Sequence, residues 1–238
     1  MNQLPHHKLI LLPGLDGTGR LFSTLLDHFP NTSNIIVVRY PTDQILDYEQ
    51  LAEIARKQLP KSANFILVGE SFSGPIAARL INHPQLCGII FCASFLTSPR
   101  PLLLNLLSYL PVSLIIRCPL PSFLLRFACF GYRCPSRILE SFRQTIRAVS
   151  PEVFAYRIRL LRVVNDLWRI TDSPVPLGYL KASNDKLVPA ARSSEIKQEY
   201  HRLRIEEVAG SHFLLQGSPA AAKDAILRLC QQLTSPTG

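Results

Sequence analysis

The sequence predicts an α/β protein whose mostly parallel sheet carries helices on both faces. Short, continuously apolar runs alternate with helical segments before residue 99, and an alternation of strand-like and helical segments returns after residue 173. Strands that are apolar throughout are typical of a parallel sheet covered on both sides. The two parts are separated by a helical, proline-interrupted stretch that lacks this alternation. The 238 residues therefore fit one domain with an insertion better than two independent domains.

The first part of the alternation ends at residue 98. Its first apolar run, at 8–12, predicts a strand that is followed by a glycine-rich loop. The same pattern predicts strands at 35–38, 65–68 and 86–93, with helices near 21–28, at 47–59 and from 73 to about 82.

After residue 173 the same alternation returns. It predicts strands at 176–182 and 204–208 and helices at 190–199 and 219–233. We therefore expect one core domain, made of residues 1–98 and 174–238.

Residues 99–173, the inserted segment, are expected to form a helical lid on this core. Apolar positions recur with helical spacing over 138–149, and Pro151 is suited to the first turn of a helix that runs to about Trp168. The segment contains eleven arginines and no lysine against four acidic residues, which is +7 of the formal net charge of +9. The positive charge is thus concentrated in one part of the chain.

Several classes of protein are disfavoured by composition. The N-terminal apolar run is too short for a signal peptide, and the most apolar segment, 102–116, is broken by Asn105 and Pro111 and falls short of a membrane span. The six cysteines show neither a CxxC pair nor histidines at zinc-ligand spacing. We expect a cytoplasmic protein with reduced thiols, no transmembrane segment and no metal.

A strand-to-helix turn at 64–75 presents a candidate nucleophile. The strand ends at Gly69, Ser71 follows in a tight bend, and a helix opens at Ser73. This layout is typical of a nucleophile elbow, in which small residues two positions before and after the serine allow the backbone to pass close to its neighbours. Alone, the pattern could equally be a turn in which Ser71 caps the helix.

A serine nucleophile requires a base and an acid, and later strand ends supply both. Asp185 follows the strand at 176–182, and His212 follows the strand at 204–208. The order serine, aspartate, histidine is the one used by hydrolases with this kind of elbow. Asp185 could instead be an ordinary turn residue, in which case Asp166 and Asp172 are the reserve acids.

These motifs together resemble the α/β-hydrolase superfamily over nearly the whole chain. The loop at 12–19, the elbow at 69–74, the Asn184-Asp185 turn and the segment 210–212 fall where that superfamily places its oxyanion loop, nucleophile, acid and base. The chain departs from many members by having Pro13-Gly14 in place of His-Gly. The resemblance implies the α/β-hydrolase fold with a lid insertion.

The resemblance also implies roles for five residues. Ser71, Asp185 and His212 would form the catalytic triad, and the backbone N–H groups of Leu15 and Phe72 would form the oxyanion hole. No metal or organic cofactor is implied. A nucleotide site at the glycine-rich loop is disfavoured, because glycines at 14, 17 and 19 do not follow the GxGxxG spacing.

The function expected from these residues is hydrolysis of an ester or thioester of an apolar acyl group through an acyl-enzyme. Apolar residues beside the nucleophile and in the inserted segment are candidates for the acyl pocket: Phe72, Leu103, Leu106, Leu107, Phe123 and Phe127. The arginines could face an acidic carrier protein that delivers the acyl chain, an anionic lipid surface, or solvent alone, and nucleic acid is not expected. The first alternative is an acyltransferase or esterase that acts on acyl chains carried by acyl carrier protein or coenzyme A. The second is a non-catalytic binding protein with a hydrolase fold.

Overall fold

The computed structural model describes residues 7–107, 121–131 and 134–235. These residues form a six-stranded sheet in the order β2-β1-β3-β4-β5-β6, and every neighbouring pair is parallel. The strands are β1 (Lys8–Leu12), β2 (Ile35–Val37), β3 (Phe65–Glu70), β4 (Leu86–Cys92), β5 (Leu177–Ala182) and β6 (Arg204–Val208). The predicted fold class is confirmed, and each predicted strand agrees with the observed one to within two residues at its ends.

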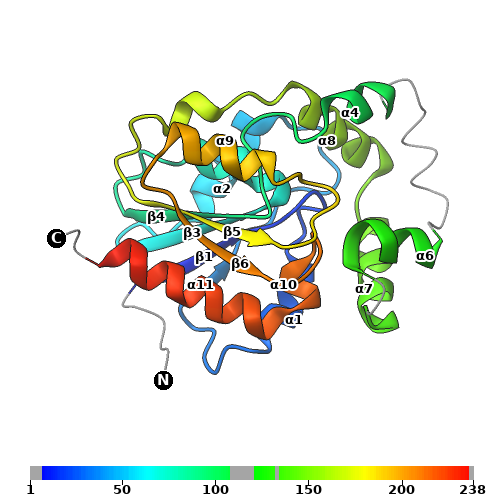
Figure 1. Ribbon diagram of the computed structural model, residues 1–238, viewed down its shortest axis with the longest axis horizontal. Helices are drawn as coiled ribbons and strands as arrows, with labels where there is room; N and C mark the ends of the chain where they lie inside the picture. The colour runs from blue at the N-terminus through cyan, green and yellow to red at the C-terminus, as the bar shows by residue number, and fades with distance from the viewer. Residues whose placement is uncertain (1–6, 108–120, 132–133, 236–238) are drawn as a thin grey trace.

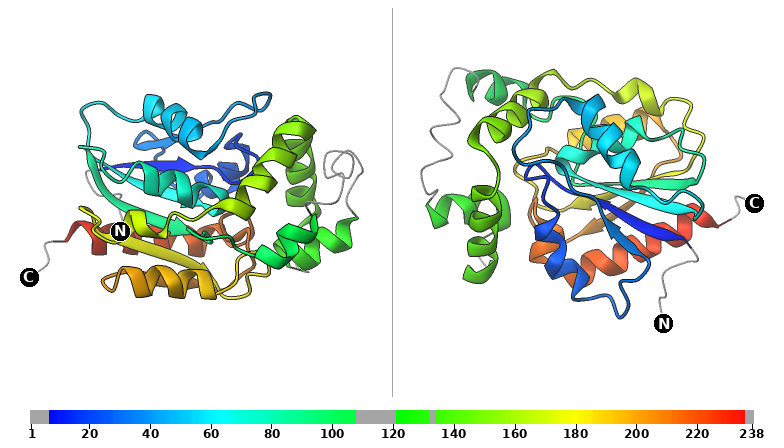
Figure 2. Two further views of the ribbon diagram at one scale, coloured as in Figure 1. Left: turned by 90° about the horizontal axis from the view of Figure 1, so that it is seen from above. Right: turned by 180° about the vertical axis from the view of Figure 1, so that it is seen from behind.

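Helices cover both faces of the sheet (Figures 1 and 2). One face packs against α2 (Tyr48–Gln58), α3 (Gly74–Arg79) and α9 (Ala191–Glu199), through buried side chains such as Leu51, Ile76 and Ile196. The other face packs against α1 (Ser23–Leu26), α10 (Leu214–Gly217) and α11 (Pro219–Thr234). Since both faces of the sheet are covered, alternate residues of the central strands pack into different cores, which explains why these strands are apolar. The edge strand β6 is the exception, because it contains Arg204, Glu206 and Glu207 and only Val208 is buried.

The inserted segment lies beyond the carboxyl ends of the strands, toward which the strand arrows point in Figure 1. Its helical elements are α4 (Pro101–Leu107), α6 (Ser122–Leu125), a π-helical turn (Arg126–Phe130), α7 (Ser136–Arg147), α8 (Pro151–Val163) and a 3-10 turn (Leu167–Ile170). The predicted helix from Pro151 to Trp168 thus ends early, at Val163. It stops because Asn165 forms an antiparallel bridge with Thr97 and the Asp166 N–H donates to the Leu96 carbonyl.

Asp166, one of the two reserve acids, ties the end of the inserted segment to the core. Its side chain is 3% exposed and forms ion pairs with Arg79 and Arg169, and both arginines also contact Glu49 on α2. A buried carboxylate needs such partners, because an unpaired charge in the interior is strongly unfavourable. Asp166 therefore has a structural role, and it lies away from the candidate site.

Candidate active site

The nucleophile elbow forms where β3 ends and α3 begins. Ser71 has a φ of 47°, a left-handed conformation that is uncommon for residues other than glycine. Gly69 permits the turn, because a Cβ at that position would lie 3.0 Å from the Ser73 carbonyl oxygen. The strained bend holds the Ser71 hydroxyl above the carboxyl edge of the sheet, as expected for an exposed nucleophile.

A second strand end supports the elbow from behind. The Ser94 hydroxyl, just after β4, donates to the Ser71 carbonyl at 2.5 Å, and the Tyr179 hydroxyl donates to the Ser94 carbonyl at 2.7 Å. Gly74 gives Ser94 its room, since a Cβ at Gly74 would lie 2.0 Å from the Ser94 Oγ. Sequence reasoning missed Ser94 and Tyr179, because no local motif marks a side chain that holds a backbone carbonyl on another strand.

The structure brings Ser71, His212 and Asp185 into one hydrogen-bonded chain. His212 Nε2 lies 2.9 Å from Ser71 Oγ, and His212 Nδ1 lies 2.8 Å from Asp185 Oδ2. The other carboxylate oxygen of Asp185 accepts from the backbone N–H groups of Leu187 at 2.9 Å and Val188 at 2.8 Å. The carboxylate is therefore fixed by the loop after β5 and can in turn fix the imidazole.

The loop after β1 lies against the elbow. The Ser73 hydroxyl donates to the Pro13 carbonyl and also contacts the Tyr40 hydroxyl at 2.9 Å. Asp16 is buried, and its Oδ2 accepts from the N–H of Thr18 at 2.8 Å and from its hydroxyl. The small Ser73 side chain, which departs from the usual glycine of the elbow, thus connects the two loops.

Glu70, the residue before Ser71, is a buried acid that sequence reasoning passed over. Its side chain lines the same cavity as Ser71 and accepts from Gln216 Nε2 at 3.0 Å. The pKa of the Glu70 carboxyl is raised to about 7, chiefly by burial and also by nearby Asp16, although Gln216, His212 and the Gly14 N–H favour the charged form. Glu70 thus titrates near neutral pH inside the site.

We expect Glu70 to make stability pH-dependent between about 4.5 and 7. In this window the folded protein keeps the proton that the unfolded chain releases, so the free energy of unfolding falls as pH rises and then levels off above about 7. Glu70→Gln removes this ionisation and should gain, relative to wild type, about 3 kcal/mol between pH 4.5 and 8. Urea unfolding of both proteins at the two pH values measures the difference. An equal pH dependence in both would contradict the assignment.

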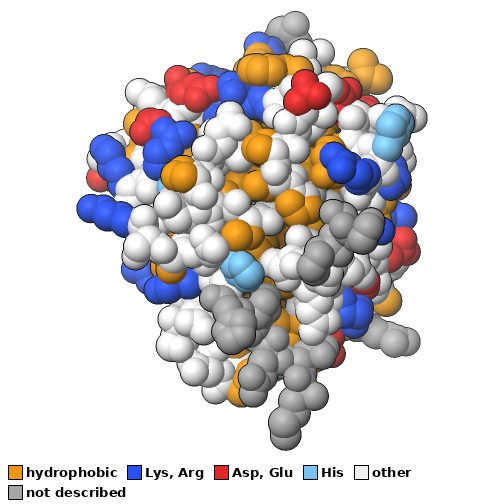
Figure 3. Space-filling model, turned by 90° about the vertical axis from the view of Figure 1, so that its left-hand side faces the viewer, with side chains coloured by type: hydrophobic (Ala, Val, Ile, Leu, Met, Phe, Trp, Pro, Cys, Tyr) orange, Lys and Arg blue, Asp and Glu red, His pale blue; other side chains and the backbone are white. Residues whose placement is uncertain are grey.

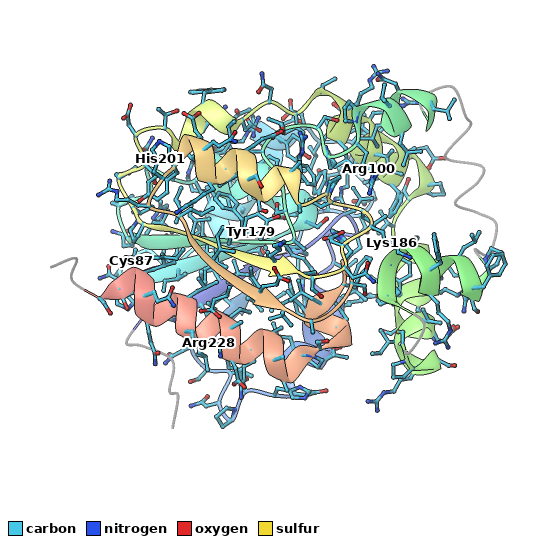
Figure 4. The ribbon with its side chains drawn as sticks, viewed as in Figure 1. Cys87, Arg100, Tyr179, Lys186, His201 and Arg228 are labelled. Atoms are coloured by element: carbon cyan, nitrogen blue, oxygen red, sulfur yellow. The ribbon has the colours of Figure 1, made fainter. Side chains whose placement is uncertain are left out.

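An apolar cavity of about 280 Å³ opens beside the triad. Its walls come from the core and from the inserted segment, and include Leu104, Phe142, Ile146, Phe154, Ile158 and Phe213. Arg100 lies at the same cavity and donates to the carbonyls of Lys186 and Leu187, in the loop that holds Asp185. Figure 4 shows Arg100 and Lys186 on the side of the core that faces the inserted helices.

Only some of the predicted pocket residues line this cavity. Phe72 and Leu103 do, whereas Leu106, Phe123 and Phe127 are 65%, 66% and 51% exposed and lie outside its lining. The Phe127 ring is instead covered by the Lys186 ammonium, 3.5 Å from the ring centroid. The Leu107 side chain lies outside the described residues. Helical spacing shows which residues share a face, but it does not show which face turns to the sheet.

The described part of the chain offers no metal site and no membrane-spanning helix. No group of three or more His, Cys, Asp or Glu side chains within it is placed to hold a metal ion. None of its helices has both the length and the apolar character needed to cross a membrane.

The sheet order and the placement of the site define the α/β-hydrolase fold. No protein-family model matches the sequence, and no curated protein matches it. Solved structures do match. An esterase from Exiguobacterium antarcticum aligns with a TM-score of 0.77 at 14% identity, over 96% of this chain and 93% of that one.

Two other solved structures are similar to a comparable degree. A hydrolase from Oleispira antarctica has a TM-score of 0.77 at 13% identity, covering 95% of this chain and 92% of that chain. The enol-lactonase from Burkholderia xenovorans LB400 has a TM-score of 0.73 at 16% identity, covering 94% and 91%. At these identities the likeness establishes the fold, and the activity must be argued from the site.

Proposed function

We propose that the protein is a serine hydrolase that cleaves a carboxylic ester or thioester of an apolar acyl group. The observation that carries the proposal is the continuous hydrogen-bonded chain from Ser71 through His212 to Asp185, beside an apolar cavity. A serine so connected has a base to take its proton and an acid to orient that base. The esterase, hydrolase and lactonase structures that share the fold support the same class of reaction.

In the proposed mechanism Ser71 Oγ attacks the substrate carbonyl carbon while His212 Nε2 takes the hydroxyl proton. Asp185 holds His212 Nδ1–H and stabilises the imidazolium that forms. The backbone N–H groups of Leu15 and Phe72 stabilise the negative oxygen of the tetrahedral intermediate. His212 then returns its proton to the leaving group, and water attacks the acyl-enzyme by the same route to release the acid.

A chain-length series of acyl esters and matching thioesters tests the proposal. We expect kcat/KM to rise about fourfold for each added methylene while the chain fills the apolar cavity, because burying one methylene contributes roughly 0.8 kcal/mol. The rate should fall once the cavity of about 280 Å³ is full. A preference for acetyl esters over all longer chains, or for acyl groups that carry a charge, would contradict the apolar substrate class.

An acidic carrier protein that delivers the acyl chain is the second candidate. Part of the arginine excess is used inside the molecule, as with Arg157 and Arg169. Arg137, Arg147 and Arg159 are exposed on α7 and α8 and are available to a partner. On the side turned away from the inserted helices, Lys and Arg lie toward the edges, around a middle rich in hydrophobic side chains (Figure 3). The exposed arginines of α7 and α8 are the surface that we propose for docking of such a carrier.

Salt dependence separates the two candidates. Turnover of carrier-linked esters should weaken steeply as salt is raised, while turnover of free esters should not. Salt-independent turnover of both would exclude the carrier.

The five described cysteines, all free, support the cytoplasmic location that we also propose.

A further inference from the structure

Arg157 is the largest of the side chains that are fully buried, at 1% exposure. It projects from α8 of the inserted segment, yet its hydrogen bonds reach the core. Nη1 donates to the carbonyls of Leu15 at 3.0 Å and Asp16 at 2.8 Å, and Nη2 donates to the carbonyl of Pro41 at 2.8 Å. A buried cation is costly and needs partners, and besides these carbonyls Arg157 has the Asp16 carboxylate and the Tyr40 ring nearby. Several of these partners belong to the loop after β1, so the charge of Arg157 is directed at that loop.

Two of the three bonded carbonyls, those of Leu15 and Asp16, belong to the loop that carries a proposed oxyanion donor. The Gly14 carbonyl accepts from the Gly17 N–H at 3.1 Å, which closes a four-residue turn with Leu15 and Asp16 at its centre. In a trans peptide the N–H points away from the C=O. The Leu15 N–H, which shares its peptide plane with the Gly14 carbonyl, is therefore directed out of the turn.

The two peptide planes that flank the Gly14–Leu15 peptide are both fixed by side chains from other parts of the chain. Arg157 holds the carbonyls of Leu15 and Asp16, while Ser73 holds the carbonyl of Pro13. Gly17 leaves space for the guanidinium, because a Cβ there would lie 2.5 Å from Arg157 Nη1, and its φ of 71° suits glycine. The Leu15 peptide thus lies between two anchored planes.

We propose that Arg157 is a positioning residue that locks the loop at 14–17 so that the Leu15 N–H faces the substrate's carbonyl oxygen. The proposal rests on the hydrolase function proposed above. It assigns the inserted segment a part in transition-state stabilisation, since a helix outside the core sets the orientation of a donor inside it. Preorganised donors accelerate the reaction because no free energy is spent on reorienting them as the transition state forms.

Arg157→Met tests the inference, with Arg169→Met as the matched control. Arg169 also joins the inserted segment to the core, through Asp166 and Glu49, but it does not touch the loop at 14–17. Loss of one oxyanion donor costs about a hundredfold or more, so we expect Arg157→Met to lower kcat by about that factor with KM changed less than about threefold. Arg157→Lys should recover part of the loss. Arg169→Met should retain wild-type kcat.

The affinity for a trifluoromethyl ketone inhibitor provides a second measurement, which would not change if Arg157 had only a structural role. Its adduct with Ser71 places a negative oxygen in the oxyanion hole. In Arg157→Met its inhibition constant should therefore rise by the same factor by which kcat falls, whereas the inhibition constant of the product acid should not change. Rates are expressed per active site, counted by fluorophosphonate labelling. If Arg157→Met does not fold, the same two measurements on Arg157→Lys decide the question.

The outcomes distinguish this inference from the function on which it rests. Wild-type kcat and trifluoromethyl ketone affinity in the folded variants would overturn the role of Arg157 while leaving the hydrolase intact. Equal losses in Arg157→Met and Arg169→Met would also overturn it, since the effect would then belong to anchoring of the inserted segment in general. A wild-type protein that neither reacts with fluorophosphonate nor hydrolyses any ester would refute the proposed function itself.

Discussion

Ser71→Ala is expected to lower kcat for ester hydrolysis by about a million-fold. In the proposed mechanism the Ser71 hydroxyl is the only group of the triad that forms a covalent bond to the substrate. Without it, the mechanism has no nucleophile to form the acyl-enzyme. Its Oγ lies 2.9 Å from His212 Nε2, within reach for proton transfer. The measurement is single-turnover and steady-state hydrolysis of the best ester from the chain-length series.

Fluorophosphonate labelling checks the same prediction without a known substrate. The reagent should label wild type and the control Ser194→Ala, whose hydroxyl is exposed on α9, but it should not label Ser71→Ala. Residual hydrolysis or labelling in Ser71→Ala would place the nucleophile elsewhere. Absence of labelling in wild type would favour the alternative of a non-catalytic hydrolase fold.

The fold was predictable because its signals are local. Every strand except the edge strand β6 is largely a short apolar run, and each strand end is marked by a glycine, a small residue or a polar turn. The candidate triad could be predicted for the same reason, since Ser71, Asp185 and His212 each follow a strand directly. Parallel strands bring their carboxyl ends to one edge, so residues distant in sequence become neighbours there.

Contacts made by single long side chains could not be predicted. Arg157 looked like one of eleven arginines on helical surfaces, and nothing in its spacing shows that it reaches carbonyls more than a hundred residues earlier. Glu70 looked like the variable residue of an elbow. Its raised pKa depends on burial against a helix near the C-terminus, which becomes apparent only from the packing.

The lining of the apolar cavity could be predicted only in part, for a related reason. Leu106 and Phe123 were candidates as apolar residues of the inserted segment, and both are largely exposed. Phe142 and Ile146, on the predicted apolar face within 138–149, line the cavity although they were not among the candidates. An amphipathic pattern identifies a buried face, but the partner of that face depends on how the helices are placed in three dimensions.

Asp185→Asn is expected to lower kcat by about ten-thousandfold while the protein stays folded. The carboxylate accepts two backbone N–H groups through Oδ1 and the His212 Nδ1–H through Oδ2. An asparagine can satisfy the two N–H groups only with its carbonyl oxygen, which turns its NH₂ group toward His212 Nδ1. The imidazole proton then moves to Nε2, where it faces Ser71, and His212 can no longer accept the serine proton.

Asp172→Asn is the matched control, because Asp172 is the exposed reserve acid of the inserted segment. It should leave kcat unchanged, and rates per labelled active site on one ester compare the variants directly. Asp185→Asn should also retain fluorophosphonate labelling at a greatly reduced rate, since Ser71 is still present but is no longer activated. Retained activity in Asp185→Asn, with a large loss in Asp172→Asn, would reverse the assignment of the acid.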